Sequence, residues 1–231
     1  VEYDGIMSNG LNLKDATINI NSYKVSGLNR AISIFKDINI TNSNININRF
    51  STGIKGDSTT ITSSTLNFDG CAENIKLENR ELNVNSSNIY STNNAPQSSL
   101  VSSMGTAINL KDSVIKANDG SLIQGIYAFS LLNIKNSTVD FICQSYGFKG
   151  ISTMTVDNST INALSKDDHT LNINNLLDIK DSIINAEGGT NKTAILLGSN
   201  KHNEADYKIR ITLSGDSYVK NNMKLSKSEV N

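Results

Sequence analysis

The chain is poor in the residues that build aromatic cores and rigid turns. Its 231 residues include no tryptophan and one proline, and aromatic residues make up only 6%. Charged residues make up 19%, below the usual level of about 25%. The surface must therefore rely on asparagine, serine and threonine. Isoleucine, leucine and valine still recur at close spacing, which is enough to bury a core and excludes a disordered chain.

Neither sign of charge is in excess, since 21 basic residues face 22 acidic ones. We expect no nucleic-acid partner, because such surfaces carry a basic patch. Apolar runs are far shorter than the ~20 residues of a membrane span, so membrane insertion is not expected either. No charged-then-apolar leader opens the chain, which begins at Val1. We interpret it as part of a longer surface protein.

A ten-residue pattern recurs along the whole chain. It reads apolar, polar, apolar, polar, Asx or Ser, Ser, any, apolar, polar, and apolar or small. Successive copies begin 21 to 34 residues apart, a period typical of solenoid proteins. The copies are LNLKDATINI from Leu11, INITNSNINI from Ile38, TTITSSTLNF from Thr59, LNVNSSNIYS from Leu82, INLKDSVIKA from Ile108, LNIKNSTVDF from Leu132, MTVDNSTINA from Met154, LDIKDSIINA from Leu177 and, more loosely, ITLSGDSYVK from Ile211.

Each copy has the alternation of a strand, a bend and a second strand. In one copy Leu132 and Ile134 point to one side, Asn136 and Ser137 interrupt the alternation, and Val139 restarts it. A single coil cannot bury its apolar face, so the copies must stack around a shared core. The fifth and sixth positions are nearly always Asx or Ser, and we expect them to form turn ladders along the stack.

The repeat predicts an all-β fold, a right-handed parallel β-helix of about nine coils, in one domain over residues 1–231. A leucine-rich repeat would need a helical return, and no segment has helical periodicity. A β-sandwich would not require columns of identical chemistry. In the β-helix Cys71 and Cys143 lie about three coils apart, or ~14 Å, too far for a disulfide. We interpret both as core residues.

Three segments interrupt the repeat, at residues 93–106, 165–169 and 199–208. Insertions in solenoids become loops on one face, which is often the binding face. We expect the first segment to protrude between coils and the second to form a charged turn.

The residues for cleaving a polysaccharide are not apparent. A lyase needs an arginine beside acids, and none of the four arginines is expected to lie in a cluster with acids of neighbouring coils. A hydrolase needs paired carboxylates, but Asp167 and Asp168 would point to opposite sides of a strand. His169 and His202 are interpreted as exposed loop residues, so no catalytic residue is predicted. The arginines are Arg30, Arg49, Arg80 and Arg210.

Two features suit a binding surface. The second position of the repeat holds a row of neutral hydrogen-bonding side chains, which includes Asn109 and Asn133. Such a row suits carbohydrate hydroxyls, and it equally suits plain solvation of a long sheet. Tyr127 and Tyr146 fall in consecutive coils beside glycines. They are the candidates for an exposed aromatic platform, and Phe148 is a candidate core residue.

Calcium is a possible cofactor because it takes six to eight oxygen ligands from carboxylates and carbonyls. Asp178 and Asp181 are close in sequence, and Asp157 belongs to the coil before them. These three aspartates are the predicted metal ligands. The alternation of lysine and aspartate around them is also typical of ordinary surface charges.

The glycine-bearing strands carry a family resemblance. DGI from Asp4, TGIKG from Thr52 and YGFKG from Tyr146 each precede a copy of the repeat. In these motifs the chain resembles the bacterial carbohydrate-binding-domain family of secreted parallel β-helices, which is related in fold to pectate lyases. Bacterial adhesins and phage tail fibres share the architecture. Only Asp4 keeps the aspartate that the family has before Gly-Ile.

The resemblance implies an extracellular or cell-surface protein that binds polysaccharide and associates with calcium. We therefore expect a non-catalytic module that binds polysaccharide or a host surface. A structural stalk or spacer of a surface protein is the second hypothesis, and a lyase-type enzyme is the third.

Overall fold

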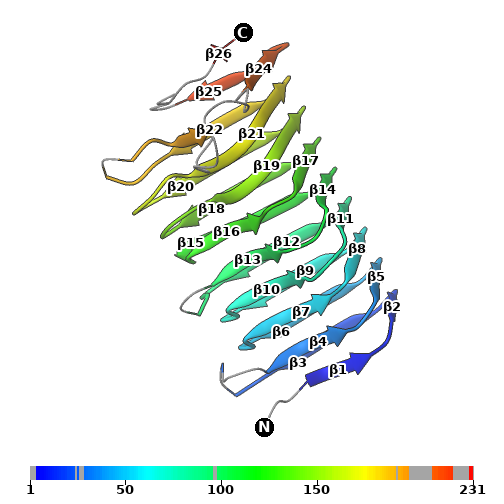
Figure 1. The fold of residues 1–231 in the computed structure, drawn as a ribbon. Coiled ribbons are helices and arrows are strands. Elements are labelled where there is room, and N and C mark those ends of the chain that lie inside the picture. Colours follow the sequence, from blue (N-terminus) through cyan, green and yellow to red (C-terminus); the bar gives the residue numbers. More distant parts are fainter. Residues whose placement is uncertain are drawn as a thin grey trace.

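The computed structural model describes residues 4–23, 25, 29–95, 98–190, 192–197, 210–220 and 229–230. Within these residues all regular structure is β-strand, and every strand pairing is parallel. The strands stack into a parallel β-helix of about eight complete coils, followed by strands of a ninth (Figure 1). The predicted fold class is confirmed.

Each coil contributes one strand to each of three faces. The first face is formed by β1 (Asp4–Ser8), β4 (Arg30–Ile34), β7 (Thr52–Gly56), β10 (Glu73–Leu77), β13 (Ser99–Ser103), β16 (Gln124–Ala128), the beginnings of β19 (Phe148–Asp157) and β21 (Leu171–Lys180), and β23 (Ile195–Leu197).

The second face continues each coil after a corner. It is formed by β2 (Leu11–Lys14), β5 (Asp37–Thr41), β8 (Ser58–Thr62), β11 (Leu82–Asn85), β14 (Ala107–Lys111), β17 (Leu131–Lys135), the ends of β19 and β21, β24 (Arg210–Ser214) and β26 (Glu229–Val230). Because β19 and β21 run through the corner, the first two faces join into one 17-stranded sheet.

The third face is a separate nine-stranded sheet. It is formed by β3 (Thr17–Asn21), β6 (Asn44–Asn48), β9 (Thr65–Asp69), β12 (Asn88–Thr92), β15 (Val114–Leu122), β18 (Thr138–Cys143), β20 (Thr160–Ser165), β22 (Ile183–Glu187) and β25 (Tyr218–Lys220). Coil six is therefore β16 to β18, coil seven is β19 and β20, and coil eight is β21 and β22.

The copies of the repeat stack in register, so equal positions of neighbouring coils lie side by side. Leu82 pairs with Ile108, and Ile108 with Leu132. From the second coil to the eighth, most inward side chains are buried in one continuous apolar core. Cys71 and Cys143 belong to this core and are free thiols, as predicted. Burial raises the pKa of Cys71 to about 11 and that of Cys143 to about 12.

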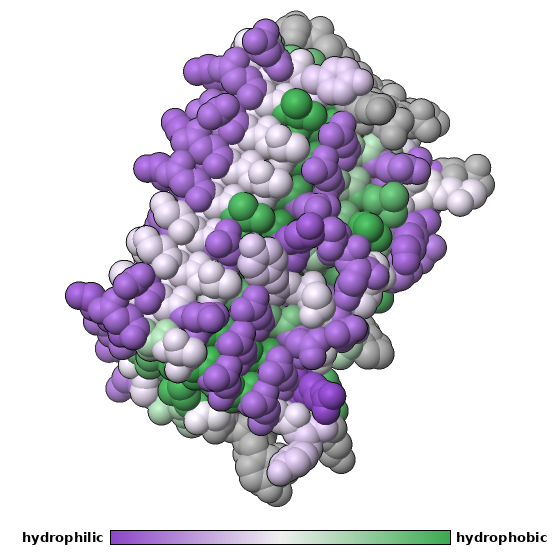
Figure 2. All heavy atoms as spheres, turned by 180° about the vertical axis from the view of Figure 1, so that it is seen from behind, coloured by the Kyte–Doolittle hydropathy of each residue, from purple (hydrophilic) through white to green (hydrophobic). Residues whose placement is uncertain are grey.

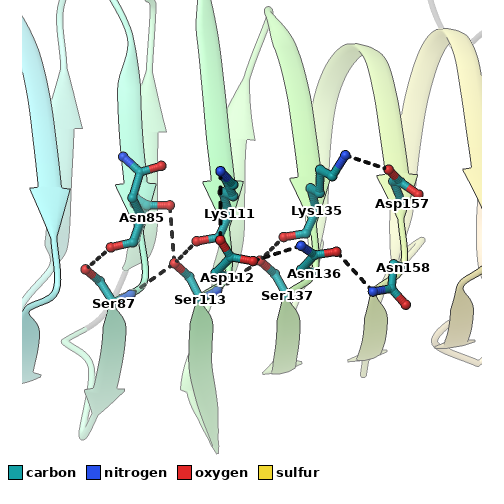
Figure 3. Close-up of polar contacts among 11 residues, drawn as sticks. Asn85, Ser87, Lys111, Asp112, Ser113, Lys135, Asn136, Ser137, Asp157 and Asn158 are labelled. Carbon is teal, nitrogen blue, oxygen red and sulfur yellow. Dashed lines mark hydrogen bonds and ion pairs between the residues drawn. The ribbon is translucent and has the colours of Figure 1, made fainter.

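The fifth position of the repeat turns the chain between the second and third faces. All eight of its described Asp, Asn and Ser residues have φ between 45° and 52°, the left-handed region that asparagine and aspartate tolerate best. Their side chains also bond along the stack, as when Asn136 donates to Asp112 at 2.8 Å and Asn158 to Asn136 at 3.0 Å (Figure 3). The predicted turn ladder is confirmed.

The sixth position forms a serine ladder, made of Ser43, Ser64, Ser87, Ser113, Ser137, Ser159 and Ser182. Each hydroxyl donates to the carbonyl two residues before it and accepts a backbone N–H from the coil before. Ser113 Oγ, for example, donates to the Lys111 carbonyl at 2.6 Å and accepts from Ser87 N at 3.2 Å (Figure 3). In the first coil the equivalent residue is Ala16, whose backbone N–H donates to Ser43 Oγ at 3.1 Å.

Packing explains the motif glycine Gly53 and its equivalent on β16, Gly125. A Cβ on Gly53 would lie 2.6 Å from the Phe68 ring, and one on Gly125 would lie 2.6 Å from the Phe141 ring. Real Cβ atoms do not approach so closely, so only glycine leaves room for these buried rings. The similarity of the glycine-bearing strands therefore has a structural cause inside the core.

The segments that interrupt the repeat differ in structure. The sequence predicts a protruding loop over 93–106, but Ser99–Ser103 forms β13, in register with β10 and β16. This prediction was wrong because the strand buries Ser99 and Ser103 in place of apolar residues. Residues 165–169 form the expected turn after β20. Residues 199–208, with His202, lie outside the described residues.

Outside the core the surface is mostly polar, as the outward positions of the repeat require. Figure 2 shows hydrophilic side chains in rows along one side of the stack, with single hydrophobic residues between them. Hydrophobic atoms also show near the lower end of this view, where the N-terminal coil lies. In that coil Ile6, Leu11, Leu13, Ile18 and Ile20 are only partly buried.

Candidate functional site

Four side chains from coils six and seven gather on the outside of the first face. Tyr127 lies on β16 and Phe129 directly follows this strand, while Lys149 lies on β19 and Tyr146 just before it. We call these four residues the aromatic patch. The strand register places Tyr127 beside Lys149 of the next coil. The patch therefore exists only because the two coils stack.

The lysine of the patch lies between the two tyrosines. Lys149 Nζ is 5.5 Å from the centre of the Tyr127 ring and 4.8 Å from the centre of the Tyr146 ring, within the ~6 Å range of cation–π attraction. The Tyr127 and Phe129 rings meet edge to face, with centres 5.2 Å apart. Phe129 remains 55% exposed. The patch thus presents both π surface and positive charge to solvent.

Strand alternation determines which side chains face outward here. Ile126 and Ala128 on either side of Tyr127 are buried, as is Phe148 beside Lys149. Below the patch, the Phe141 and Phe148 rings contact each other with centres 5.5 Å apart. Phe148 is thus a core residue, as predicted. The rigid core beneath the patch fixes the positions of its outward neighbours.

Three polar side chains, Asp168, His169 and Lys192, lie together beside Tyr146 at the border of the patch. Burial, with a hydrogen bond to Asp168 and the negative charge of that carboxylate, raises the pKa of Tyr146 to about 12. Asp168 Oδ1 lies 3.8 Å from Lys192 Nζ and 3.9 Å from His169 Nε2. The tyrosine hydroxyl donates its one proton to Asp168, so its oxygen remains as an acceptor for other groups.

His169 differs from its prediction as an exposed loop residue. Its side chain is only 17% exposed, and Nδ1 lies 2.8 Å from the Thr193 carbonyl and 2.9 Å from the Thr193 hydroxyl. The reason is that the segment after coil eight passes over the 165–169 turn. His169 is therefore anchored beside the patch rather than free in solvent.

Protein-family models, curated proteins and solved structures give no significant match to this chain. The fold is the parallel β-helix also seen in pectate-lyase-like proteins. Function is therefore inferred from this fold and from the geometry of the surface. Within the described residues no helix is long and apolar enough to cross a membrane.

The predicted asparagines lie on a different face from the tyrosines. Asn133 Nδ2 donates to Asn109 Oδ1 at 2.8 Å, and Asn109 Nδ2 donates to Asn83 Oδ1 at 2.9 Å. Thr155 continues this row by donating to Asn133. The row is a hydrogen-bonded ladder on the second face, so part of its bonding capacity already serves the stack. The structure brings Tyr127 and Tyr146 together but not with Asn109 and Asn133.

The three predicted calcium ligands are not brought together. Asp157 Oδ2 lies 3.2 Å from Lys135 Nζ (Figure 3), and Asp181 Oδ1 accepts the Asp216 amide at 3.2 Å. Asp178 lies in another row, beside Thr155. Among the residues that the structure describes, no group of three or more His, Cys, Asp or Glu side chains is placed to hold a metal ion.

One arginine does meet acids from neighbouring coils, contrary to the sequence-based expectation. Arg80 Nη1 lies 3.5 Å from Asp37 Oδ1, and Arg80 Nε lies 3.4 Å from Asp57 Oδ2. The prediction was wrong because residues 43 and 23 positions apart become neighbours only after stacking. The Arg80 side chain is 64% exposed, and ion pairs that are so exposed contribute little to stability.

Sequence reasoning missed two members of the aromatic patch. Lys149 lies within the YGFKG motif, whose glycines carry the family resemblance, and Phe129 lies just beyond a strand end. Reading the outward positions of the glycine-bearing strands as one row would have placed Lys149 beside Tyr127. Phe129 carried no such signal, because corner residues do not follow the alternation.

Proposed function

We propose that the chain is a non-catalytic extracellular module that binds polysaccharide through the aromatic patch, in the manner of the secreted carbohydrate-binding β-helices it resembles. The observation that carries the proposal is the convergence of Tyr127, Tyr146 and Lys149 from two coils. Aromatic rings offer a flat apolar surface with a polar rim, which suits the C–H face and hydroxyl edge of a sugar ring.

The surroundings of the patch support this reading. Most other outward positions of the repeat carry Asn, Ser, Thr or paired charges. In the patch, by contrast, Phe129 is exposed and the two tyrosines are partly exposed, and contiguous apolar surface of this kind marks interaction sites. The Tyr146 hydroxyl, which donates its proton to Asp168, would accept a hydrogen bond from a sugar hydroxyl, and Lys149 would contact hydroxyl or carboxylate oxygens.

The second candidate function is a structural spacer. It is favoured by the unbroken serine ladder, which runs from coil two to coil eight. A spacer needs this rigid stack and nothing more, so it would bind no glycan. The two functions therefore differ in a measurable way.

The test is a glycan-binding screen of the unmodified chain against plant, bacterial and host polysaccharides, with calcium and then with chelator. Tyr127→Ala and Tyr146→Ala should each weaken binding by roughly tenfold, as expected for about 1.4 kcal/mol of lost stacking. Tyr90→Ala is the matched control, because Tyr90 is also outward but lies on the third face. No binding by the unmodified chain would favour the spacer, and equal loss in all three variants would show that the aromatic patch is not the binding site.

A further inference from the structure

The third face carries a second departure from the repeat. Its outward positions form three parallel rows along the stack. In the row nearest the strand ends, the early coils hold polar residues, namely Asn21, Asn48, Asp69 and Thr92. Coils six and seven instead hold Ile142 and Leu164, both partly exposed. Nothing in the core requires these two aliphatic side chains, because they point away from it.

An open groove of about 390 Å³ lies beside Ile142 and Leu164. We call it the third-face groove. The backbone of Phe141, Ala163 and Ala186 belongs to its floor, since their side chains are buried. The outward residues that line it are Asp140, Ile142, Asn162, Leu164, Asn185 and Glu187, from β18, β20 and β22.

The two sides of the groove differ in chemistry. One side is aliphatic, formed by Ile142 and Leu164. The other is a row of polar side chains in which Asn185 Nδ2 donates to Asn162 Oδ1 at 2.8 Å. Within the described part of the chain, the Asn162 amide nitrogen makes no hydrogen bond. The groove therefore offers apolar contact and hydrogen-bonding groups on opposite sides.

The groove is lined by two carboxylates, and in the ranges that the structure describes only that of Asp140 is paired with a lysine. Asp140 Oδ2 lies 3.8 Å from Lys116 Nζ, and it also accepts a hydrogen bond from Asn118 at 3.3 Å. Glu187 lies at the far end, is exposed, and has no ion-pair partner among the described residues. An anionic ligand would therefore be repelled, and a cationic one would meet an unpaired carboxylate only at that end. An uncharged ligand with both C–H and hydroxyl surface fits this arrangement better.

A peptide strand is not favoured as the occupant. β20 is paired with β18 on one edge and with β22 on the other. No free strand edge is therefore present in the groove for backbone hydrogen bonds, which supply most of the affinity when a peptide adds to a sheet.

We propose that the third-face groove is a second binding site, separate from the aromatic patch, that holds a stretch of an uncharged oligosaccharide. Ile142 and Leu164 contact the C–H face of the sugar rings, and Asn162 and Asn185 bond to their hydroxyls. Because the groove runs along the stack, the saccharide lies across successive coils. This inference does not rest on the function of the aromatic patch.

The test uses the double variant Ile142→Asn/Leu164→Asn. Asparagine occupies the same row at Asn21 and Asn48, so the variant keeps residue types that this face already accepts. The probes are the hexasaccharides of cellulose, mannan and starch, titrated into the full chain by calorimetry. Loss of the apolar contacts should weaken binding about tenfold, the change expected for roughly 1.4 kcal/mol. The Tyr127→Ala/Tyr146→Ala double variant is titrated in parallel.

The outcomes separate the two sites. Weaker binding in the groove variant supports the groove, whether or not the tyrosine variant also weakens. Full binding in the groove variant with loss in the tyrosine variant overturns the groove and leaves the aromatic patch standing. No binding of any neutral probe to the unmodified chain also overturns the groove, while charged glycans still test the patch. Binding of a peptide mixture alone, abolished in the groove variant, would show that the occupant is a protein.

Discussion

The serine ladder gives the most direct prediction about stability. Replacing Ser113 with alanine removes a hydroxyl that accepts the Ser87 N–H at 3.2 Å and donates to the Lys111 carbonyl at 2.6 Å. The carbonyl keeps another partner, since it also accepts the Ser86 N–H at 2.9 Å. The Ser87 N–H, by contrast, is left without an acceptor inside a buried turn.

The magnitude follows from these two changes. A buried donor left unsatisfied costs ~1–3 kcal/mol, and the lost hydroxyl bond adds ~1 kcal/mol. We therefore expect Ser113→Ala to lower the free energy of unfolding by about 2–4 kcal/mol. For a chain of this length the melting temperature should fall by about 4–16 °C, taking ~2–4 °C for each kcal/mol.

The assay is urea and thermal unfolding followed by far-ultraviolet circular dichroism. Ser102→Ala is the matched control, because Ser102 lies outward on the first face between Lys76 and Tyr127. This control should change stability by no more than ~0.5 kcal/mol. If Ser113→Ala is no more destabilising than Ser102→Ala, the hydroxyl does not satisfy the turn and the reasoning is refuted.

Two further predictions concern packing and protonation. Gly125→Ala should lower the free energy of unfolding by about 2 kcal/mol or more, because its Cβ would lie 2.6 Å from the Phe141 ring. Chemical unfolding measures this change. Gly10→Ala is the control, because the atom nearest to its Cβ would be 3.8 Å away. Tyr146 should ionise near pH 12 rather than its usual 10, because of burial and Asp168. Since the unfolded chain loses this proton first, the contribution of Tyr146 to stability is full below pH 10 and is lost as the pH rises toward 12. Ultraviolet titration of the folded chain should show one tyrosine that ionises later than the others and that is absent from Tyr146→Phe. A folded chain in which every tyrosine ionises near pH 10 would contradict the assignment.

The fold was predictable because its determinants are local and repeated. Alternation in the copy at Leu132 gives the strand faces, and the Asn-Ser pair marks a turn that needs φ > 0 at Asn136. Repetition of the same pattern then supplies the register. The exception is β13, where Ser99 and Ser103 are buried in a strand with weak apolar alternation. Its neighbours in the stack, rather than its own sequence, determine its structure.

The candidate site was only half predictable. Tyr127 and Tyr146 could be singled out as surface aromatics, although both are only partly exposed, and their shared contact with Lys149 depends on the register between β16 and β19. The pairing of Arg80 with Asp37 is a further contact made by stacking. Such contacts join residues whose separation in sequence varies with the length of each coil. Local patterns cannot reveal them before the register is known.

The in-register stack also bears on how the gene can change. Every regular coil offers its neighbours the same turn residue, the same serine and the same apolar columns. A tandem duplication or deletion of one repeat would therefore join surfaces that already match. The module can lengthen or shorten by whole coils in this way without new compensating substitutions. The aromatic patch and the third-face groove both lie in coils six to eight, so changes in the first four coils would leave them intact. Length and binding surface can therefore evolve separately in this protein.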